Sequence, residues 1–226
     1  MATETYEPAD RRPIASREHK LWQQVAAFLA ARQVSANAIS VAGMVAGVVA
    51  GLLLASTSRV ENSWSQRLLW LAGAAGIQLR LLANMLDGMV AIASGKASRL
   101  GELYNELPDR VSDVAIVIGA GYAMGGIAIL GYVAACVAVL TAYVRAVGKA
   151  AGASSLFIGP MAKPHRMFVL TVVGALMAVL PGSWQPSWGE QHAGLATAGL
   201  AIIIVGGLVT VFRRLNLIVR HLQRPS

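Results

Sequence analysis

Two stretches decide the fold of this chain: Asn84-Met-Leu-Asp87-Gly88-Met-Val-Ala91, and Gly101-Glu-Leu-Tyr-Asn105-Glu-Leu-Pro-Asp109. They place carboxylate and amide oxygens within or next to long apolar runs. A buried polar group is costly unless it is paired, and ionisable residues inside membrane spans usually mark a functional site. The two stretches therefore predict a polar site inside a helical bundle that is embedded in a membrane.

The composition is that of an integral membrane protein. Of the 226 residues, 56% are hydrophobic and 13% are charged, whereas soluble domains carry about 25% charged residues. The formal net charge is +8. Cationic loops beside anionic lipids explain this charge better than a nucleic-acid partner, because no basic motif is interleaved with aromatic residues. Membrane lipids are the expected partner, and nucleic acid is not.

Apolar runs divide the chain and predict an all-α fold, a bundle of six membrane-spanning helices. The predicted spans are residues 36–56, 68–94, 98–122, 127–148, 167–180 and 193–212. The predicted divisions are a disordered tail (1–15), an amphipathic helix (16–34), a six-span domain (35–218) and a basic C-terminal tail (219–226).

The amphipathic helix is expected to lie on the membrane surface. Leu21, Val25, Phe28 and Leu29 recur at helical spacing among basic residues, which is typical of an interfacial helix. A cytoplasmic packing helix is the alternative.

The first predicted span carries Gly43, Gly47 and Gly51, four residues apart. Such a ridge of small residues lets another helix approach closely. The approaching helix can belong to the same chain or to a second copy.

Charged residues orient the six predicted spans. The loops on one side and both ends of the chain carry most of the basic residues, among them Lys20, Lys96, Arg145, Lys149, Lys163, Arg166, Arg213 and Arg214. The other side carries Arg59 and Arg67. The positive-inside rule therefore predicts a multi-pass protein of the cytoplasmic membrane, with both termini and the polar site facing the cytoplasm.

Two sets of residues share one helical face each: Arg80, Asn84, Asp87 and Ala91 on the second predicted span, and Gly101, Asn105, Asp109 and Asp113 on the third. Both sets follow the spacing of an α-helical face. The loop between them is short, so the spans are antiparallel. Asp87 and Asp109 each lie roughly 12 Å from the loop, so the faces can meet at one depth. Hard cations such as Mg²⁺ or Mn²⁺ prefer the resulting oxygen-rich cluster.

Arg80 is expected to pair with Asp113, because an unpaired arginine inside a membrane span is costly. Asp113 then has a structural role, and Glu102 is an auxiliary acid near the site.

The spacing resembles the signature of the CDP-alcohol phosphatidyltransferase family. That signature reads D-x2-D-G-x2-A-R-x8-G-x3-D-x3-D, and every spacing matches. Five of its eight named positions are kept, whereas Asn84 and Asn105 replace the first and third aspartates and Ile92 replaces the arginine. The entry to the first span, Ser35-Ala-Asn37-Ala-Ile39-Ser40, and the stretch Ala142-Tyr143-Val144-Arg145-Ala146 also resemble family segments.

The resemblance implies an enzyme that transfers a phosphatidyl group from a CDP-activated lipid, such as CDP-diacylglycerol, to a small alcohol and releases CMP. It also implies a homodimer and two divalent metal ions, Mg²⁺ or Mn²⁺. By position, the implied roles are metal ligands for Asn84, Asp87, Asn105 and Asp109, general base for Asp109, and contacts to nucleotide or lipid for Gly88, Ala91, Gly101 and Asn37. Arg145, Lys163 and Arg166 form a basic cluster suited to phosphate on the lipid or the acceptor.

Two other functions stay open. The two asparagines remove two negative charges from a metal site, which is compatible with a catalytically degenerate homologue that binds lipid. Polar residues in a bundle can also line an ion path in a transporter, although no inverted repeat is visible. The acceptor alcohol has no readable code in the sequence.

Overall fold

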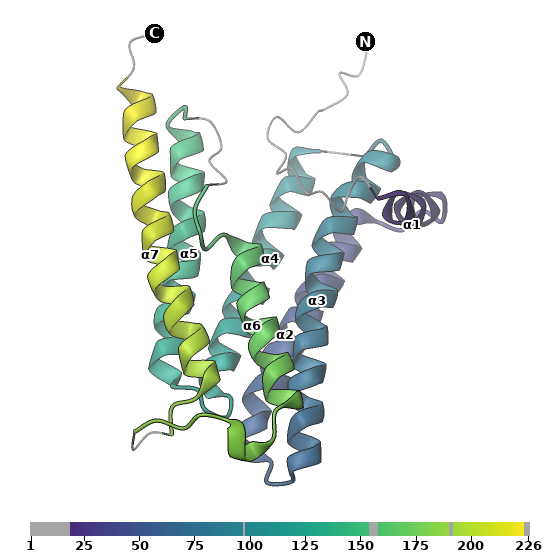
Figure 1. Cartoon of the computed structure of the whole chain (residues 1–226). Coiled ribbons are helices and arrows are strands. Elements are labelled where there is room, and N and C mark those ends of the chain that lie inside the picture. Colours follow the sequence, from purple (N-terminus) through teal and green to yellow (C-terminus); the bar gives the residue numbers. More distant parts are fainter. Residues whose placement is uncertain (1–18, 97, 154–157, 190–191, 224–226) are drawn as a thin grey trace, which may run out of the picture.

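The computed structural model describes residues 19–96, 98–153, 158–189 and 192–223, without the side chains of residues 99, 100 and 102. The predicted tail 1–15 and the start of the predicted amphipathic helix lie outside these residues. The described chain is built from α-helices joined by turns (Figure 1). The helices are α1 (Lys20–Ala31), α2 (Ala36–Ser56), α3 (Ser63–Ala93), α4 (Arg99–Tyr122), α5 (Ala128–Ala150), α6 (Lys163–Val179) and α7 (Leu195–Leu222), with 3₁₀ turns at Thr57–Arg59 and Gly182–Trp184.

Four of the described helices are long and apolar enough to cross a membrane: α2 with its following turn, α3, α5 and α7. The chain is therefore a multi-pass membrane protein. Two further predicted spans coincide with α4, which carries charged residues and Pro108 in its interior, and with α6, which has 17 residues. Both run alongside the other helices of the bundle (Figure 1), but the count of six spans remains a prediction.

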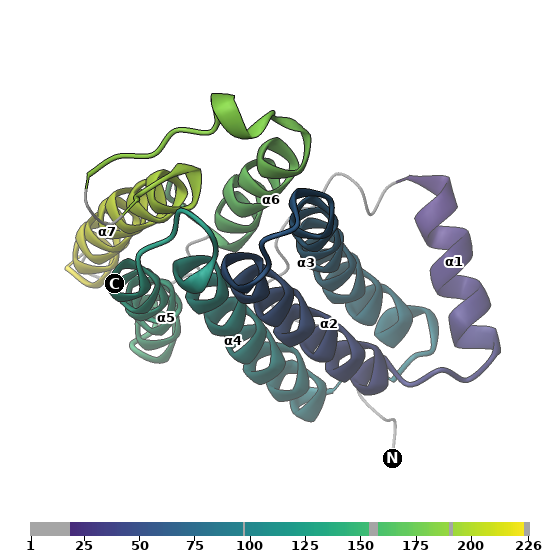
Figure 2. The same cartoon turned by 90° about the horizontal axis from the view of Figure 1, so that it is seen from below.

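Helix α1 lies across the end of the bundle rather than along it. Figure 2 shows α1 lengthwise where α2, α3 and α4 are seen closer to end-on. It packs against α3 and buries Ala26, while Leu21 and Phe28 are exposed. Its insertion into a membrane surface remains a prediction.

The glycine ridge of α2 packs inside the chain. A Cβ built on Gly43 would lie 2.8 Å from the Cβ of Ala83 on α3, and one on Gly47 would overlap Ser112 on α4. Gly51 likewise faces the backbone of α4 at Ala115. Of the two partners that the sequence left open for this ridge, the structure selects α3 and α4 of the same chain.

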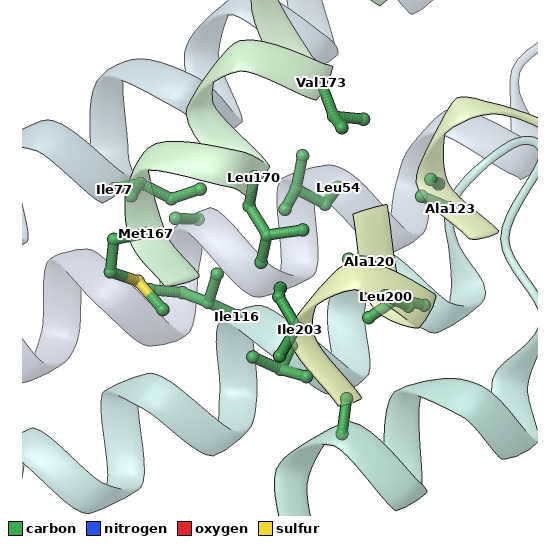
Figure 3. Packing of buried hydrophobic residues seen from close by; sticks show 14 of the residues in the cluster. Leu54, Ile77, Ile116, Ala120, Ala123, Met167, Leu170, Val173, Leu200 and Ile203 are labelled. Carbon is green, nitrogen blue, oxygen red and sulfur yellow. The ribbon is translucent and has the colours of Figure 1, made fainter. Parts of the chain in front are cut away.

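Buried apolar side chains from several helices pack together inside the bundle (Figure 3). Its members come from all the helices from α2 to α7, and include Leu54, Ile77, Ile116, Met167, Leu170 and Ile203. All six are nearly inaccessible to solvent. The core therefore holds α3, α4 and α6 in fixed positions, and these three helices carry most of the polar site.

Among the predicted spans, three helix ends differ from the predicted boundaries by four or more residues. α3 begins at Ser63, ahead of the predicted span 68–94. α6 begins at Lys163, ahead of the predicted span 167–180, because Pro164 stands in its first turn, where proline costs no hydrogen bond. α7 runs through residue 218 to Leu222, so the helix continues into the segment that we assigned to the C-terminal tail.

Candidate active site

A tight turn brings the two polar faces together. α3 ends with Gly95 at φ 65°, and the N–H groups of Gly95 and Lys96 bond the carbonyls of Ile92 and Ala91 at 2.9 and 3.0 Å. This is a Schellman end, which favours glycine at the left-handed position. Ser98 then caps α4 by accepting a bond from the N–H of Gly101 at 3.1 Å. The chain thus reverses within a few residues.

Asn84 links the two helices at the centre of the site. Its Nδ2 donates to Asn105 Oδ1 at 2.6 Å and to Asp109 Oδ2 at 3.1 Å. Three of the four predicted metal ligands are thereby in direct contact, as their common depth predicted.

Asp87, the fourth predicted ligand, is held from the other side. Its Oδ2 accepts a bond from Ser40 on α2 at 2.7 Å, and its Oδ1 accepts one from the N–H of Gly88. The Asp87 side chain is 3% exposed. In the described part of the chain, no lysine or arginine lies within ion-pair distance of it. Hydrogen bonds to neutral donors therefore position this carboxylate.

Arg80 forms the floor of the site. Its Nη2 pairs with Asp113 Oδ1 at 2.6 Å and with Asp109 Oδ1 at 3.1 Å, and its Nε donates to Ser112 at 2.9 Å. The predicted pair of Arg80 with Asp113 is confirmed. The additional contact with Asp109 was not predicted from the sequence.

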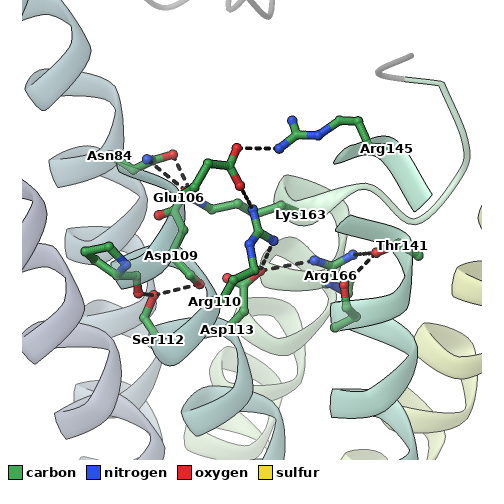
Figure 4. A network of polar contacts seen from close by, with 12 residues as sticks. Asn84, Glu106, Asp109, Arg110, Ser112, Asp113, Thr141, Arg145, Lys163 and Arg166 are labelled. Carbon is green, nitrogen blue, oxygen red and sulfur yellow. Dashed lines mark hydrogen bonds and ion pairs between the residues drawn. The ribbon is translucent and has the colours of Figure 1, made fainter. Parts of the chain in front are cut away.

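Lys163 enters the site from α6 (Figure 4). Its ammonium forms an ion pair with Asp109 Oδ2 and donates to Asn84 Oδ1 at 2.8 Å. The Lys163 side chain is 14% exposed. The sequence placed this lysine in a loop ahead of the fifth span. The earlier start of α6 instead directs it toward the carboxylate.

Arg166 lies one turn further along α6 and is buried. Its Nη2 pairs with Asp113 Oδ2 at 3.1 Å, and its Nη1 donates to Thr141 of α5 and to the carbonyl of Met161. Because it is 2% exposed, we assign it a supporting role rather than the direct phosphate contact that the sequence predicted. Asp113 thus joins Arg80 of α3 and Arg166 of α6 through α4.

Arg145 stands at the edge of the site. Its guanidinium forms an ion pair with Glu106, and the same carboxylate accepts a bond from Arg110 at 2.7 Å. The Arg145 side chain is 22% exposed and that of Glu106 is 49% exposed. An anion from solution can therefore reach Arg145.

The remaining predicted residues lie around the cluster. Gly88 and Ala91 are half-buried on α3, one turn apart. Gly101 is half-buried in the first turn of α4, and Asn37 is half-buried one turn before Ser40. Glu102 lies in α4, but its side chain is outside the described part of the structure.

The oxygen donors suit a hard divalent cation, with Asp87 and Asp109 as the carboxylates and Asn84 and Asn105 as amide donors. Among the described residues, no group of three histidine, cysteine, aspartate or glutamate side chains is placed to hold a metal.

Four residues of the network escaped the sequence prediction: Ser40, Arg110, Ser112 and Thr141. Ser40 lies within the segment that resembles the family entry to the first span, so that resemblance was an available signal. Arg110 contacts Glu106 and Asp113 of its own helix at i,i+4 and i,i+3 spacing, so its helical spacing was an available signal. Thr141 contacts Arg166 across the packing of α5 and α6, which the sequence does not encode locally.

The sequence of the chain is similar to those of several named bacterial proteins. No protein-family model matches the chain. It is 31% identical over 195 residues to phosphatidylinositol phosphate synthase of Streptomyces avermitilis, covering 84% of this chain and 74% of that protein. It is 27% identical over 205 residues to the synthase of the same name from Mycobacteroides abscessus, covering 87% and 83%. Inner membrane protein YnbA of Escherichia coli is 26% identical over 154 residues, 68% of this chain and 73% of that protein.

Solved structures agree in fold. The Mycobacterium tuberculosis phosphatidylinositol phosphate synthase with CDP-DAG bound superposes with a TM-score of 0.71 at 17% identity, covering 92% of this chain and 99% of that chain. The same enzyme in complex with manganese and citrate gives a TM-score of 0.70 at 18% identity, covering 91% and 93%. Together with the sequence identity to the Streptomyces synthase, this places the chain in the CDP-alcohol phosphatidyltransferase family.

Proposed function

We propose that this protein transfers a substituted phosphate group from a CDP-activated lipid, such as CDP-diacylglycerol, to a small alcohol and releases CMP. One observation carries the proposal. Asn84, Asn105 and Asp109 converge at 2.6 and 3.1 Å, in the frame that family members share. Asp87 lies one helical turn from Asn84. The function of a transporter would not explain why these residues keep the spacing of the family signature.

Asp109 is the proposed general base. The acceptor hydroxyl oxygen attacks the lipid-bearing phosphorus, the bond from that phosphorus to the CMP oxygen breaks, and the hydroxyl proton passes to Asp109. A carboxylate offers about four lone-pair positions. Arg80, Lys163 and Asn84 engage three of them. The remaining position, on Oδ1, is available for the proton.

A divalent cation held by Asp87, when bound, would neutralise charge that develops on the departing CMP. Among the protein's own groups, Lys163 and Arg145 supply positive charge for phosphate oxygens. Lys163 has three N–H donors, and its two described contacts leave one for an anionic ligand. Arg166 holds α6, and with it Lys163, against α4.

The nucleotide would lie against α3. Gly88 and Ala91 present almost no side-chain bulk beside Asp87, so a flat base or ribose could approach the helix closely. Gly101 and Asn37 flank this surface from α4 and α2. We place the site on the cytoplasmic side of a six-span bundle, in line with the distribution of basic residues, and expect a homodimer.

The direct test uses purified protein in detergent with CDP-diacylglycerol, Mg²⁺ or Mn²⁺, and a pool of acceptors: glycerol 3-phosphate, inositol phosphate, serine and glycerol. CMP release that requires both metal and acceptor supports the transferase, and the mass of the lipid product identifies the acceptor. A chelator control removes the cation.

A second candidate is a degenerate homologue that binds the lipid without turnover. The observation in its favour is that both oxygens of Asp109 are engaged by cations. Binding of CDP-diacylglycerol without CMP release, for every metal and acceptor in the pool, would favour this reading. The proposed transferase would then be wrong.

A further inference from the structure

We infer that Lys163 and Arg80 take the place of one divalent cation, so that the site holds a single divalent ion on the Asp87 side. The inference rests on the proposed function, because the divalent ion belongs to it. It departs from the two ions that the family resemblance implies.

Lys163 supplies a positive charge to the site. Its ammonium contacts Asp109 Oδ2 and Asn84 Oδ1 together, which are the last and first positions of the metal-binding frame. A cation that bridged these two residues would lie where the ammonium lies. Because Lys163 comes from α6 and Arg166 anchors that helix through Asp113, the ammonium is held there by packing.

The opposite oxygen of Asp109 also faces a positive charge. Arg80 pairs with Oδ1 at 3.1 Å and is 1% exposed, fixed at the same time by Asp113 and Ser112. A buried guanidinium cannot lose its charge. Asp109 therefore has one permanent cation on one oxygen and an ammonium on the other.

The two asparagines, Asn84 and Asn105, carry amides that donate hydrogen bonds as well as accept them. Asn84 turns its nitrogen toward Asn105 and Asp109, and an amide N–H donor repels a metal cation. An aspartate at either position would offer only oxygens to a cation. The amide pair thus replaces a shared ion with hydrogen bonds.

The net charge of the site favours one divalent ion over two. Asp87 and Asp109 supply two negative charges, and Arg80 and Lys163 supply two positive charges, so the four side chains are neutral together. Two divalent ions would raise the sum to +4, and one raises it to +2, which a pyrophosphate can balance. Among the described residues, Asp87 accepts hydrogen bonds from Ser40 and from the Gly88 N–H, both neutral donors, so its carboxylate charge is available to the single ion.

The test counts manganese ions on the purified protein, independently of activity. Equilibrium dialysis followed by elemental analysis gives the number of ions per chain, and electron paramagnetic resonance detects magnetic coupling between neighbouring Mn²⁺ ions. The wild-type protein should hold one uncoupled Mn²⁺. Two coupled ions, or none, would overturn the inference.

Two triple variants of equal charge test the role of Lys163. One is Asn84→Asp, Asn105→Asp with Lys163→Met; the other carries the same two changes with Lys149→Met, which removes an exposed lysine at the end of α5. The first should bind a second, coupled Mn²⁺ at least about tenfold more tightly than the second variant, because an ammonium close to Asp109 opposes a dication there. Equal affinities of the two variants for the second Mn²⁺ would refute the inference that Lys163 takes the place of a divalent ion.

Monodisperse elution and helical circular dichroism establish that each variant is folded, and the wild-type count stands on its own if a variant is not. The outcome also separates the two proposals. CMP release by a protein that holds two coupled Mn²⁺ ions would support the proposed transferase function and contradict the single-ion inference. One ion without CMP release keeps the inference and removes the function.

Discussion

Among the individual residues, Asp113 forms ion pairs with two buried arginines, Arg80 and Arg166. Arg80 and Arg166 reach its two carboxylate oxygens at 2.6 and 3.1 Å, and all three side chains are at most 2% exposed. Breaking a buried pair leaves a charge without a partner, which costs about 3–5 kcal/mol. We therefore expect Asp113→Asn to lower the free energy of unfolding by several kcal/mol in detergent denaturation experiments.

Glu106→Gln is the matched control for Asp113→Asn, because it removes a carboxylate from the same helix. Glu106 is 49% exposed, and exposed ion pairs contribute about 0–1 kcal/mol. Equal destabilisation by the two variants would contradict a structural role for the buried network.

Ser40 positions Asp87 across the interface of α2 and α3. Ser40→Ala removes the 2.7 Å bond to Oδ2 and should weaken Mn²⁺ binding, while costing about 1 kcal/mol of stability. Ser56→Ala on the same helix removes a bond to a local carbonyl and should leave Mn²⁺ affinity unchanged. Titration of both variants with Mn²⁺ tests whether Ser40 positions Asp87 for metal binding. Unchanged Mn²⁺ affinity in Ser40→Ala would argue against Asp87 as a ligand.

The sequence predicted some residue contacts and could not predict others. Arg80 and Asp113 were paired from the cost of a lone arginine in a membrane. The contact of Lys163 with Asp109 depends on how α6 packs beside α4, a relation between segments far apart in the chain. The burial of Arg166 follows from the same packing and was missed for the same reason.

At the scale of elements, the close packing of α2 depends on its glycines. A Cβ on Gly47 would overlap Ser112 of α4, and overpacking typically costs about 1–3 kcal/mol. Gly47→Ala should therefore destabilise the bundle in thermal unfolding. Gly182→Ala is the control, because a Cβ there meets nothing within 4 Å. A neutral Gly47→Ala would mean that α2 and α4 are not in close contact.

Helix boundaries show where local sequence is sufficient. α2 spans residues 36–56 as predicted, because its apolar run and its ends coincide. α6 starts earlier than its apolar run, since Pro164 favours a helix start within the basic segment. Hydropathy alone therefore placed Lys163 outside the helix that directs it into the site.

At the scale of the whole molecule, the distribution of basic residues predicts an orientation in the membrane. After Cys136→Ala removes the one cysteine of the chain, single cysteines can be placed by Ser183→Cys and Lys149→Cys at opposite ends of the bundle. A membrane-impermeant maleimide should label Ser183→Cys in intact cells and Lys149→Cys only after permeabilisation. The reverse pattern would invert the proposed topology and place the site outside the cytoplasm.

We propose that this chain releases CMP from a CDP-activated lipid with Asp109 as the base. The most direct measurement compares the rate of metal-dependent CMP release by wild-type protein with that of Asp109→Ala and of Glu61→Ala, an exposed acid outside the site. We predict release by wild type and Glu61→Ala, and a loss of about 10²–10⁴-fold in Asp109→Ala. Release that persists in Asp109→Ala, or is absent from the wild type with every acceptor, would contradict the claim.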